Sequence, residues 1–530
     1  MTPFWVGAVD AESGASTAPL CEAATELARK PTAKYPPAFT MADSPNPGPR
    51  RMRWIGLAAG VVACATVVLT PTGLHRIEGY GSRPAYAAGV TALMVCWWLT
   101  EALPTAWTAC VPLVLFPAFG VFGRGPLGDV RASAMPFLDA YVFLFLGGMA
   151  IGAATEQWNL HRRIALNIMR AIGTEPKRLL LGVLVATAFI SLWISNTATA
   201  VMMFPIGLAL VKELEAARGQ GRLTLFGTAV MLAVAYGANV GGIGTKIGTG
   251  PNSIFCGFVA ENLHVDIGFL QYLAVALPFV VLFIPVVWGA LWLLARREGL
   301  ANVHGRELIE RELSAMGVWS RGERTVGIVF LGAAALWISS SLVQPLVGPH
   351  ISRLLGGFRI QGKHYEAGVS MLAAATLLVW RKLSLQALRR LPWGSLVLLG
   401  GSFTMAAGIE ESGLSIWLGE RFGGLAELPV AGQIGLATSG TIGLSAVASN
   451  TATINVALNV LPPNLPVLFA ITMGASCDFM LPAGTPPNAI VFGSGYIRLS
   501  TMIRVGFLLD VAAAIVVTLY MLAYGQWLLR

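Results

Sequence analysis

Long apolar runs constrain this chain more than any other feature of its sequence. Between residues 54 and 527 they recur with few charged residues, and many reach about 18 residues, the length that crosses a bilayer as a helix. Only 12% of all residues are charged, against roughly 25% in a soluble domain. So few charges cannot cover the surface of a soluble protein of 530 residues. The sequence therefore predicts an all-α polytopic membrane protein and excludes a soluble enzyme.

The apolar runs divide the chain into segments. Four of the predicted spans are interrupted by Gly, Pro, Ser or Thr, namely those at 179–211, 225–260, 432–461 and 467–495. The other predicted spans lie at 54–72, 85–101, 104–122, 137–155, 270–295, 326–346, 365–380, 393–410 and 503–527. We expect a disordered cytoplasmic tail at 1–50, a first transporter repeat at 54–300, a cytoplasmic interfacial helix at 301–325 and a second repeat at 326–528.

Basic residues cluster at 50–53, 296–324 and 381–390. Cytoplasmic loops carry an excess of Lys and Arg, so these clusters place the N-terminus on the cytoplasmic side. The formal net charge of +9 then reflects cytoplasmic loops and gives no reason to expect nucleic-acid binding.

An internal repeat is visible in the interrupted spans. The sequence Ser-Asn-Thr-Ala-Thr occurs at 195–199 and again at 449–453, an offset of 254 residues. A Gly-Thr-X-Pro-Asn turn occurs at 248–252 and again at 484–488, an offset of 236 residues. Two halves with Gly- and Pro-interrupted helices in matching places are typical of secondary transporters whose site lies where the repeats meet. The same Ser, Thr and Asn side chains also occur as packing groups in membrane helices, but that reading does not explain their duplication.

These motifs resemble those of the divalent anion/sodium symporter family, the sodium-dependent dicarboxylate and sulfate carriers. The resemblance covers about residues 54–528 and includes Trp98–Pro104, the two Ser-Asn-Thr motifs and Phe479–Pro482, which leads into the second turn. It implies about eleven transmembrane helices and two re-entrant hairpins in an inverted two-fold repeat. It also implies a homodimer in the cell (inner) membrane that moves its substrate by an elevator motion.

The resemblance further implies two groups of site residues. The sodium ligands would be Ser191, Ser195, Asn196 and backbone near Gly248 in one site, and Ser445, the Ala448 carbonyl, Asn450 and backbone near Gly484 in the other. The substrate carboxylates would meet Ser195, Asn196, Thr197, Thr249, Ser449, Asn450, Thr451 and Thr485.

The chemistry of these residues fits a cation-coupled anion carrier. Irregular backbone at membrane depth is tolerated where it lines a cavity, and its carbonyls suit sodium while amides and helix N-termini suit carboxylates. No Arg lies beside either Ser-Asn-Thr motif, so bound sodium ions would supply the positive charge that a dianion needs. By linkage, each ligand then raises the affinity of the other. We expect no cofactor and no metal other than sodium.

Two charges depart from the pattern of the family. Lys246 lies in the first turn region and Asp478 lies before the second. One interpretation is that Lys246 replaces a sodium ion, which would make the protein a carrier with fewer sodium ions or a sodium-independent exchanger. The other is that Lys246 pairs with Asp478 or extends to water.

The sequence favours secondary transport of a C4-dicarboxylate such as succinate, malate or fumarate, coupled to sodium. A sodium-independent dicarboxylate exchanger and a carrier of sulfate or citrate are the alternatives. A membrane enzyme would require a cluster of His, Asp, Glu or Cys at one membrane face, which the sequence lacks. A channel would require a continuous pore, which two interrupted repeats do not favour.

Overall fold

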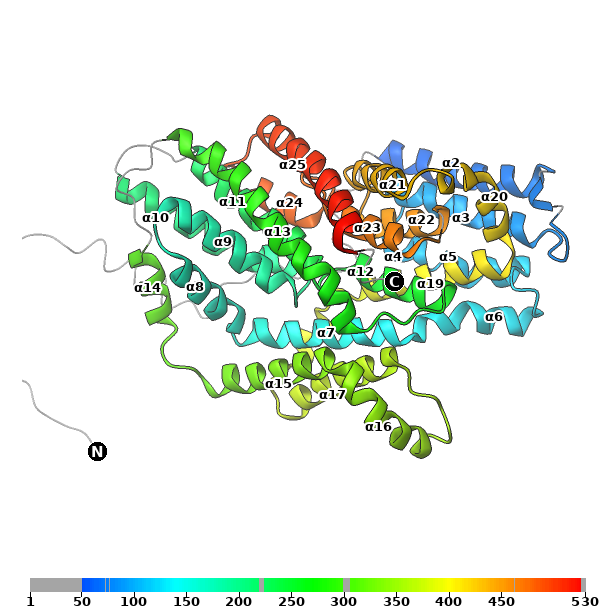
Figure 1. Cartoon of the computed structure of the whole chain (residues 1–530), viewed down its shortest axis with the longest axis horizontal. Helices are drawn as coiled ribbons and strands as arrows, with labels where there is room; N and C mark the ends of the chain where they lie inside the picture. Colours follow the sequence, from blue (N-terminus) through cyan, green and yellow to red (C-terminus); the bar gives the residue numbers. More distant parts are fainter. Residues whose placement is uncertain are drawn as a thin grey trace, which may run out of the picture. The chain divides into compact units, whose positions relative to one another are not determined.

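A computed structural model describes residues 50–525 apart from 72, 76, 219–223, 299–305 and 462. The described residues form helices and no strands, as the apolar runs predict (Figure 1). The predicted tail at 1–50 lies outside the described residues except for Arg50, which begins the first described helix. The first five residues of the predicted interfacial segment at 301–325 lie outside them as well.

The helices of the first half follow the predicted spans closely. They are α2 (Arg50–Leu69), α3 (Arg83–Leu99), α4 (Thr105–Ala109), α5 (Val111–Phe119), α6 (Pro126–Ala134), α7 (Ala140–Gln157), α8 (Leu160–Ile172), α9 (Pro176–Ser191), α10 (Asn196–Arg218), α11 (Thr224–Gly242), α12 (Gly250–Asn262) and α13 (Phe269–Ala295).

The second half continues in the same manner. Its helices are α14 (Arg306–Ala315), α15 (Arg321–Ile338), α16 (Ser340–Leu354), α17 (Gly362–Val379), α18 (Leu385–Arg389), α19 (Trp393–Glu411), α20 (Leu414–Ala426), α21 (Val430–Ser445), α22 (Asn450–Val460), α23 (Leu465–Ala475), α24 (Pro486–Phe492) and α25 (Leu499–Tyr520).

Four breaks interrupt the helices where the sequence predicts them. We call the gaps at 192–195 and 446–449 the short breaks, and those at 243–249 and 476–485 the long breaks. Each long break ends at a threonine in extended conformation, Thr249 or Thr485, with proline in the first turn of the next helix. Proline lacks the backbone N–H that a continuous helix needs, so the chain cannot pass through these points as one helix.

Five segments of the described part of the chain are long and apolar enough to cross a membrane. They are Pro126–Gln157, Asn196–Ala216, Thr224–Gly242, Phe269–Glu298 and Leu499–Gly525. The predicted span at 326–346 is not one straight helix, because α15 and α16 meet at an angle of 88° at Ser339. Together these two helices make a sixth candidate, and several other predicted spans are short or broken helices. The total of about eleven crossings stays a prediction.

Two helices of 13 residues each were not predicted, and they occupy matching places in the halves. α8 begins at Leu160 and α20 at Leu414, an offset of 254 residues that equals the offset of the Ser-Asn-Thr motifs. The chain thus repeats a long helix, a short helix and an interrupted helix in the same order in both halves.

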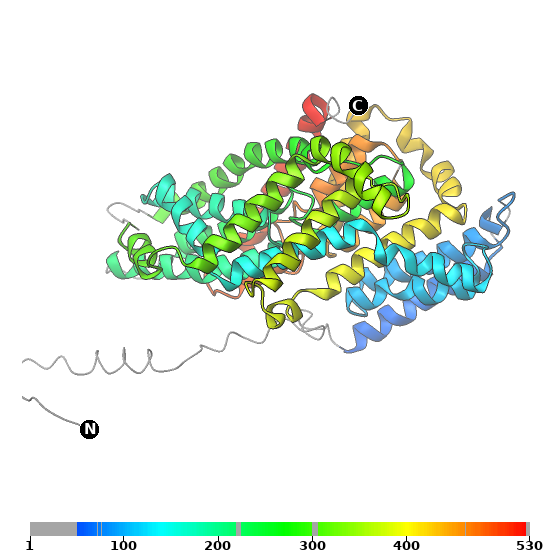
Figure 2. The same ribbon diagram turned by 90° about the horizontal axis from the view of Figure 1, so that it is seen from below.

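Packing brings the interrupted helices of the two halves together. α12 of the first half contacts both α22 and α23 of the second, and α11 contacts α24. In both views the orange segments of the second half lie among the green segments of the first (Figures 1 and 2). α7, α15 and α17 pack against one another and carry none of the breaks.

Candidate functional site

The first short break is held by a serine and an asparagine on either side of it. Ser191 ends α9, and its Oγ lies 2.9 Å from Oδ1 of Asn196, the first residue of α10. The same hydroxyl lies 2.7 Å from the backbone carbonyl of Ala238 in α11. Both side chains are buried. We call Ser191 and Asn196 the first Ser-Asn pair.

The second short break repeats this arrangement. Oγ of Ser445, at the end of α21, lies 3.0 Å from Oδ1 of Asn450, at the start of α22, and 2.7 Å from the carbonyl of Ala475. We call Ser445 and Asn450 the second Ser-Asn pair. In both pairs a serine hydroxyl contacts an asparagine Oδ1 and the backbone carbonyl of an alanine. The sequence repeat is therefore also a repeat of side-chain contacts.

Asparagine side chains hold the long breaks in a similar way. Nδ2 of Asn252 donates to the carbonyls of Gly242 at 2.8 Å and Thr245 at 2.6 Å. Nδ2 of Asn488 donates to the carbonyls of Asp478 at 3.2 Å and Leu481 at 3.0 Å. Because the amides engage some of the unpaired carbonyls of each break, the irregular backbone is fixed inside the protein.

Three glycines show how closely these pieces meet. A Cβ on Gly242 would overlap with Oδ1 of Asn196, and one on Gly248 would overlap with the carbonyl of Gly242. A Cβ on Gly250 would lie 3.3 Å from Oγ1 of Thr451 in the other half. The first Ser-Asn pair thus packs directly on the first long break, and that break ends beside the Ser-Asn-Thr motif of the second half.

Asn239 also joins the halves, and no sequence motif predicts it. Its Nδ2 lies 3.1 Å from the carbonyl of Asp478 and 3.3 Å from Oγ1 of Thr485. It lies in the mostly apolar helix α11 and belongs to no repeated motif, so only its neighbours in space identify it.

The predicted site residues therefore fall into two linked groups. Ser191, Asn196 and Gly248 come together in the first half, and Ser445 and Asn450 do so in the second. Ala448 is buried in the second short break, and Gly484 contacts the carboxylate of Asp478. The remaining predicted residues are Thr249 and Thr485, which are buried, and Ser195, Thr197, Ser449 and Thr451, which are half-buried.

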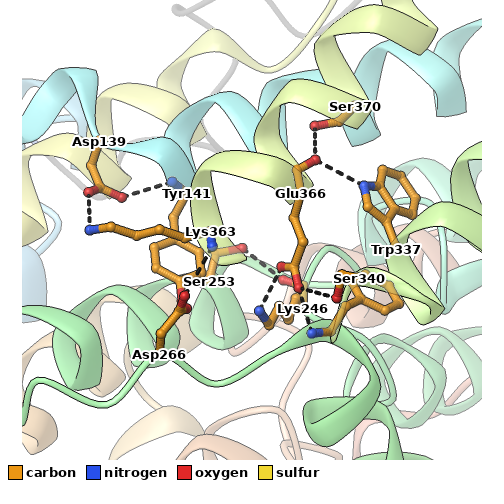
Figure 3. A network of polar contacts seen from close by, with 11 residues as sticks. Asp139, Tyr141, Lys246, Ser253, Asp266, Trp337, Ser340, Lys363, Glu366 and Ser370 are labelled. Atoms are coloured by element: carbon orange, nitrogen blue, oxygen red, sulfur yellow. Dashed lines mark hydrogen bonds and ion pairs between the residues drawn. The ribbon is translucent and has the colours of Figure 1, made fainter. Parts of the chain in front are cut away.

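Lys246 does not pair with Asp478, so that interpretation is wrong. Its Nζ lies 2.7 Å from Oε2 of Glu366 on α17, and both side chains are fully buried (Figure 3). A carboxylate offers the ammonium a full opposite charge, which no backbone group supplies. Glu366 was not predicted, because it lies 120 residues further along the chain.

Glu366 also connects several elements. Its carboxylate accepts from the backbone N–H of Phe269 at 2.6 Å and from Ser340 Oγ at 3.2 Å, and its carbonyl accepts from Trp337 Nε1 at 3.0 Å (Figure 3).

A second lysine on α17 forms ion pairs as well. One turn before Glu366, Lys363 Nζ lies 3.0 Å from both Asp139 and Glu261. Two lysine–carboxylate links therefore join α17 to the segments around the first long break.

Asp478 stands apart from this network. Its side chain is fully buried near the start of the second long break, the backbone N–H of Met480 lies near its carboxylate, and no side chain among the described residues donates to it. Oδ2 packs against Gly484, where a Cβ would overlap with it.

A cavity of about 490 Å³ lies away from the breaks. It is lined by the C-terminal ends of α12 and α22, together with parts of α19 and α20. The breaks lie at the N-terminal ends of α12 and α22, so this cavity is separate from the Ser-Asn pairs.

Comparison with known proteins extends these observations. Residues 51–530 match the protein family described as "Sodium:sulfate symporter transmembrane region". The chain is 33% identical over 491 residues to the sodium-dependent dicarboxylate transporter SdcS of Staphylococcus saprophyticus, covering 88% of this chain and 91% of that one. It is 35% identical over 460 residues to SdcS of Staphylococcus aureus strain USA300, covering 82% of this chain and 84% of that one.

A solved structure supports the fold. The YdaH transporter of Alcanivorax borkumensis aligns with 82% of this chain and 98% of its own, with a TM-score of 0.53 and 16% sequence identity. At that identity the likeness concerns the helical fold alone.

Proposed function

The chain belongs to the family of the sodium:sulfate symporter transmembrane region, and on that premise we propose that it is a secondary transporter that carries a dicarboxylate dianion together with sodium ions. The observation that carries the proposal is the duplicated Ser-Asn contact, found at both short breaks with nearly equal distances. Support for the substrate comes from the two SdcS relatives, whose names specify sodium-dependent dicarboxylate transport.

The charges around the Ser-Asn pairs explain why sodium is needed. Among the described residues, no Lys or Arg side chain hydrogen-bonds to either pair, and the nearby ammonium of Lys246 is engaged by Glu366. A dianion bound there gains its opposite charge from sodium ions, which also suit the carbonyl and hydroxyl oxygens of the breaks. Substrate and sodium then bind with positive coupling, and the sodium gradient drives uptake.

We assign the predicted residues to these roles. Sodium binds at Ser191, Ser195, Asn196 and Gly248 in the first half, and at Ser445, Ala448, Asn450 and Gly484 in the second. The substrate carboxylates contact Ser195, Asn196, Thr197, Thr249, Ser449, Asn450, Thr451 and Thr485. The hydroxyls of Ser195, Thr197, Ser449 and Thr451 are half-buried, as is Asn450, whereas Ser191, Asn196 and Ser445 are buried.

The proposal includes an arrangement for the whole protein. About eleven crossings and two re-entrant hairpins form an inverted two-fold repeat, with the repeats at 54–300 and 326–528, a cytoplasmic interfacial helix at 301–325 and the N-terminus in the cytoplasm. The protein is a homodimer in the cell (inner) membrane, and the site crosses by an elevator motion. The interrupted helices of the two halves pack against one another, which supports their motion as one body.

Uptake into liposomes tests the proposed function. Purified protein is reconstituted, and entry of labelled succinate is measured with an inward sodium gradient and with choline in place of sodium. We expect saturable, sodium-dependent uptake that unlabelled malate and fumarate inhibit more than citrate or sulfate does. Equal uptake in choline would instead establish a sodium-independent exchanger, and non-saturating flux would establish a channel.

A further inference from the structure

The fully buried carboxylate of Asp478 has no counter-charge in the described structure. No side chain donates a hydrogen bond to either of its oxygens there, although the backbone N–H of Met480 lies nearby, and no described Lys, Arg or His forms an ion pair with it. An ionised carboxylate buried without a partner is strongly disfavoured, so such a group needs either a proton or a cation. The groups near Asp478, together with the sodium titration below, distinguish a proton from a cation.

Other oxygens without partners belong to residues near Asp478. Asn239 Oδ1 and Ser476 Oγ, from residues in contact with or two positions before Asp478, also lack hydrogen-bond partners. The nearby Asp510 adds a second carboxylate, which accepts from the backbone N–H of Phe479 at 3.0 Å. A protonated carboxyl could donate to one of these acceptors, so the sodium titration below is what distinguishes a bound cation from a proton. Several oxygens without donors are what a small hard cation requires.

The position of Asp478 in the repeat gives an independent reason. Counting back 236 residues, the offset of the two turns, leads to Gly242. In the first half, residue 242 lies against Gly248, and in the second half residue 478 lies against Gly484. The offset of 237 between the Ala238 and Ala475 carbonyls leads instead to Gly241, so at either register the second half carries a carboxylate where the first half has no side chain. Gly484 is one of the sodium-binding positions of the proposed function.

We propose that Asp478 is a ligand of the second sodium ion, and that its carboxylate makes this site stronger than the first. The proposal rests on the proposed function for the location of the site. Because the protein itself supplies the negative charge, sodium binds there in the absence of substrate. The first site has no such carboxylate and binds sodium mainly together with the dianion.

Thermal unfolding of the full chain in detergent tests this without transport. The unfolding midpoint is followed as sodium chloride replaces choline chloride at constant ionic strength, with no dicarboxylate present. A ligand that binds only the folded state raises the midpoint, and the concentration needed reports its affinity. For the wild type we expect a clear, saturable rise.

The Asp478→Asn variant keeps the size of the side chain and removes its charge. We expect it to need about tenfold more sodium for the same rise, as a tenfold loss of affinity requires. Asp129→Asn is the matched control, because Asp129 is also fully buried with one unpartnered oxygen but lies on α6. It should keep the sodium dependence of the wild type.

The outcomes separate the two proposals. An unchanged sodium dependence in Asp478→Asn, or a wild type that sodium does not stabilise, would overturn the assignment of Asp478. If Asp478→Asn does not fold, Asp478→Gly, which places the residue of the first half there, serves for the same comparison. Failure of the proposed function shows separately, as a wild type that sodium stabilises but that takes up no succinate.

Discussion

At the scale of residues, the site depends on close approach of backbone to side chain. Gly242 is the clearest case, since its missing side chain leaves the space that Oδ1 of Asn196 occupies. The position therefore requires glycine for a steric reason, although its backbone is helical. The position of the first Ser-Asn pair therefore depends both on its hydrogen bond and on the space that Gly242 leaves for Oδ1 of Asn196.

Gly242→Ala should consequently displace Asn196. Overpacking of this kind costs about 1–3 kcal/mol, and we expect sodium-dependent succinate uptake to fall at least about tenfold, the factor that corresponds to 1.4 kcal/mol. Gly443→Ala is the control, because a Cβ at Gly443 in α21 meets nothing within 4 Å. Normal uptake by Gly242→Ala would show that the contact with Asn196 does not matter.

At this scale, the sequence predicts the site residues that belong to repeated motifs and does not predict those that occur once. The Ser-Asn-Thr motifs and the turns at 248–252 and 484–488 identify themselves by occurring twice. Glu366 and Asn239 occur once, and each acts through a partner more than 100 residues away. No local sequence pattern identifies such a distant partner. The expected pairing of Lys246 with Asp478 is therefore wrong, because the true partner, Glu366, lies far along the chain.

At the scale of elements, the buried Lys246–Glu366 pair joins the first long break to α17. Breaking a buried ion pair by removing one partner is strongly destabilising, because the other charge stays buried and unpaired. Glu366→Gln should therefore lower the free energy of unfolding by about 3–5 kcal/mol, measured as a shift of the thermal midpoint in detergent. The double variant Lys246→Met/Glu366→Gln should recover part of this loss.

An exposed ion pair provides the comparison. Arg306 and Glu310 on α14 are paired at 2.6 Å with side chains 72% and 49% exposed. Arg306→Ala should leave the thermal midpoint nearly unchanged, because an exposed ion pair contributes little. If Glu366→Gln is no more harmful than Arg306→Ala, or if the double variant is as unstable as the single one, the pair does not hold these elements together.

The breaks between elements could be predicted, but the bends and short helices could not. Proline and glycine at 248–251 and 484–487 exclude a continuous helix, so each long break follows from the chemistry of the backbone. The 88° bend at Ser339 has no proline or glycine beside it and follows from packing. α8 and α20 are short amphipathic or mixed segments, and a search for long apolar runs passes over them.

At the scale of the whole molecule, the fold class follows from the low charge and the long apolar runs, because both favour helices in a lipid bilayer over a surface exposed to water. The number of crossings does not follow, since broken and short helices lie inside the protein at unknown depth. The proposed function rests on the way the two halves meet, with Gly250 beside Thr451 and Asn239 beside Thr485. In that proposal each half alone offers only part of a site for a dianion.

The central claim is that both halves build one shared site, and binding stoichiometry tests it most directly. Labelled succinate bound per chain is measured at saturating sodium for the wild type, Asn196→Ala and Asn450→Ala, with Asn167→Ala on α8 as the control. We predict one succinate per chain for the wild type and the control, and loss of binding in either site variant alone. If each site variant instead keeps normal or half-normal binding, the halves bind separately and the account is contradicted.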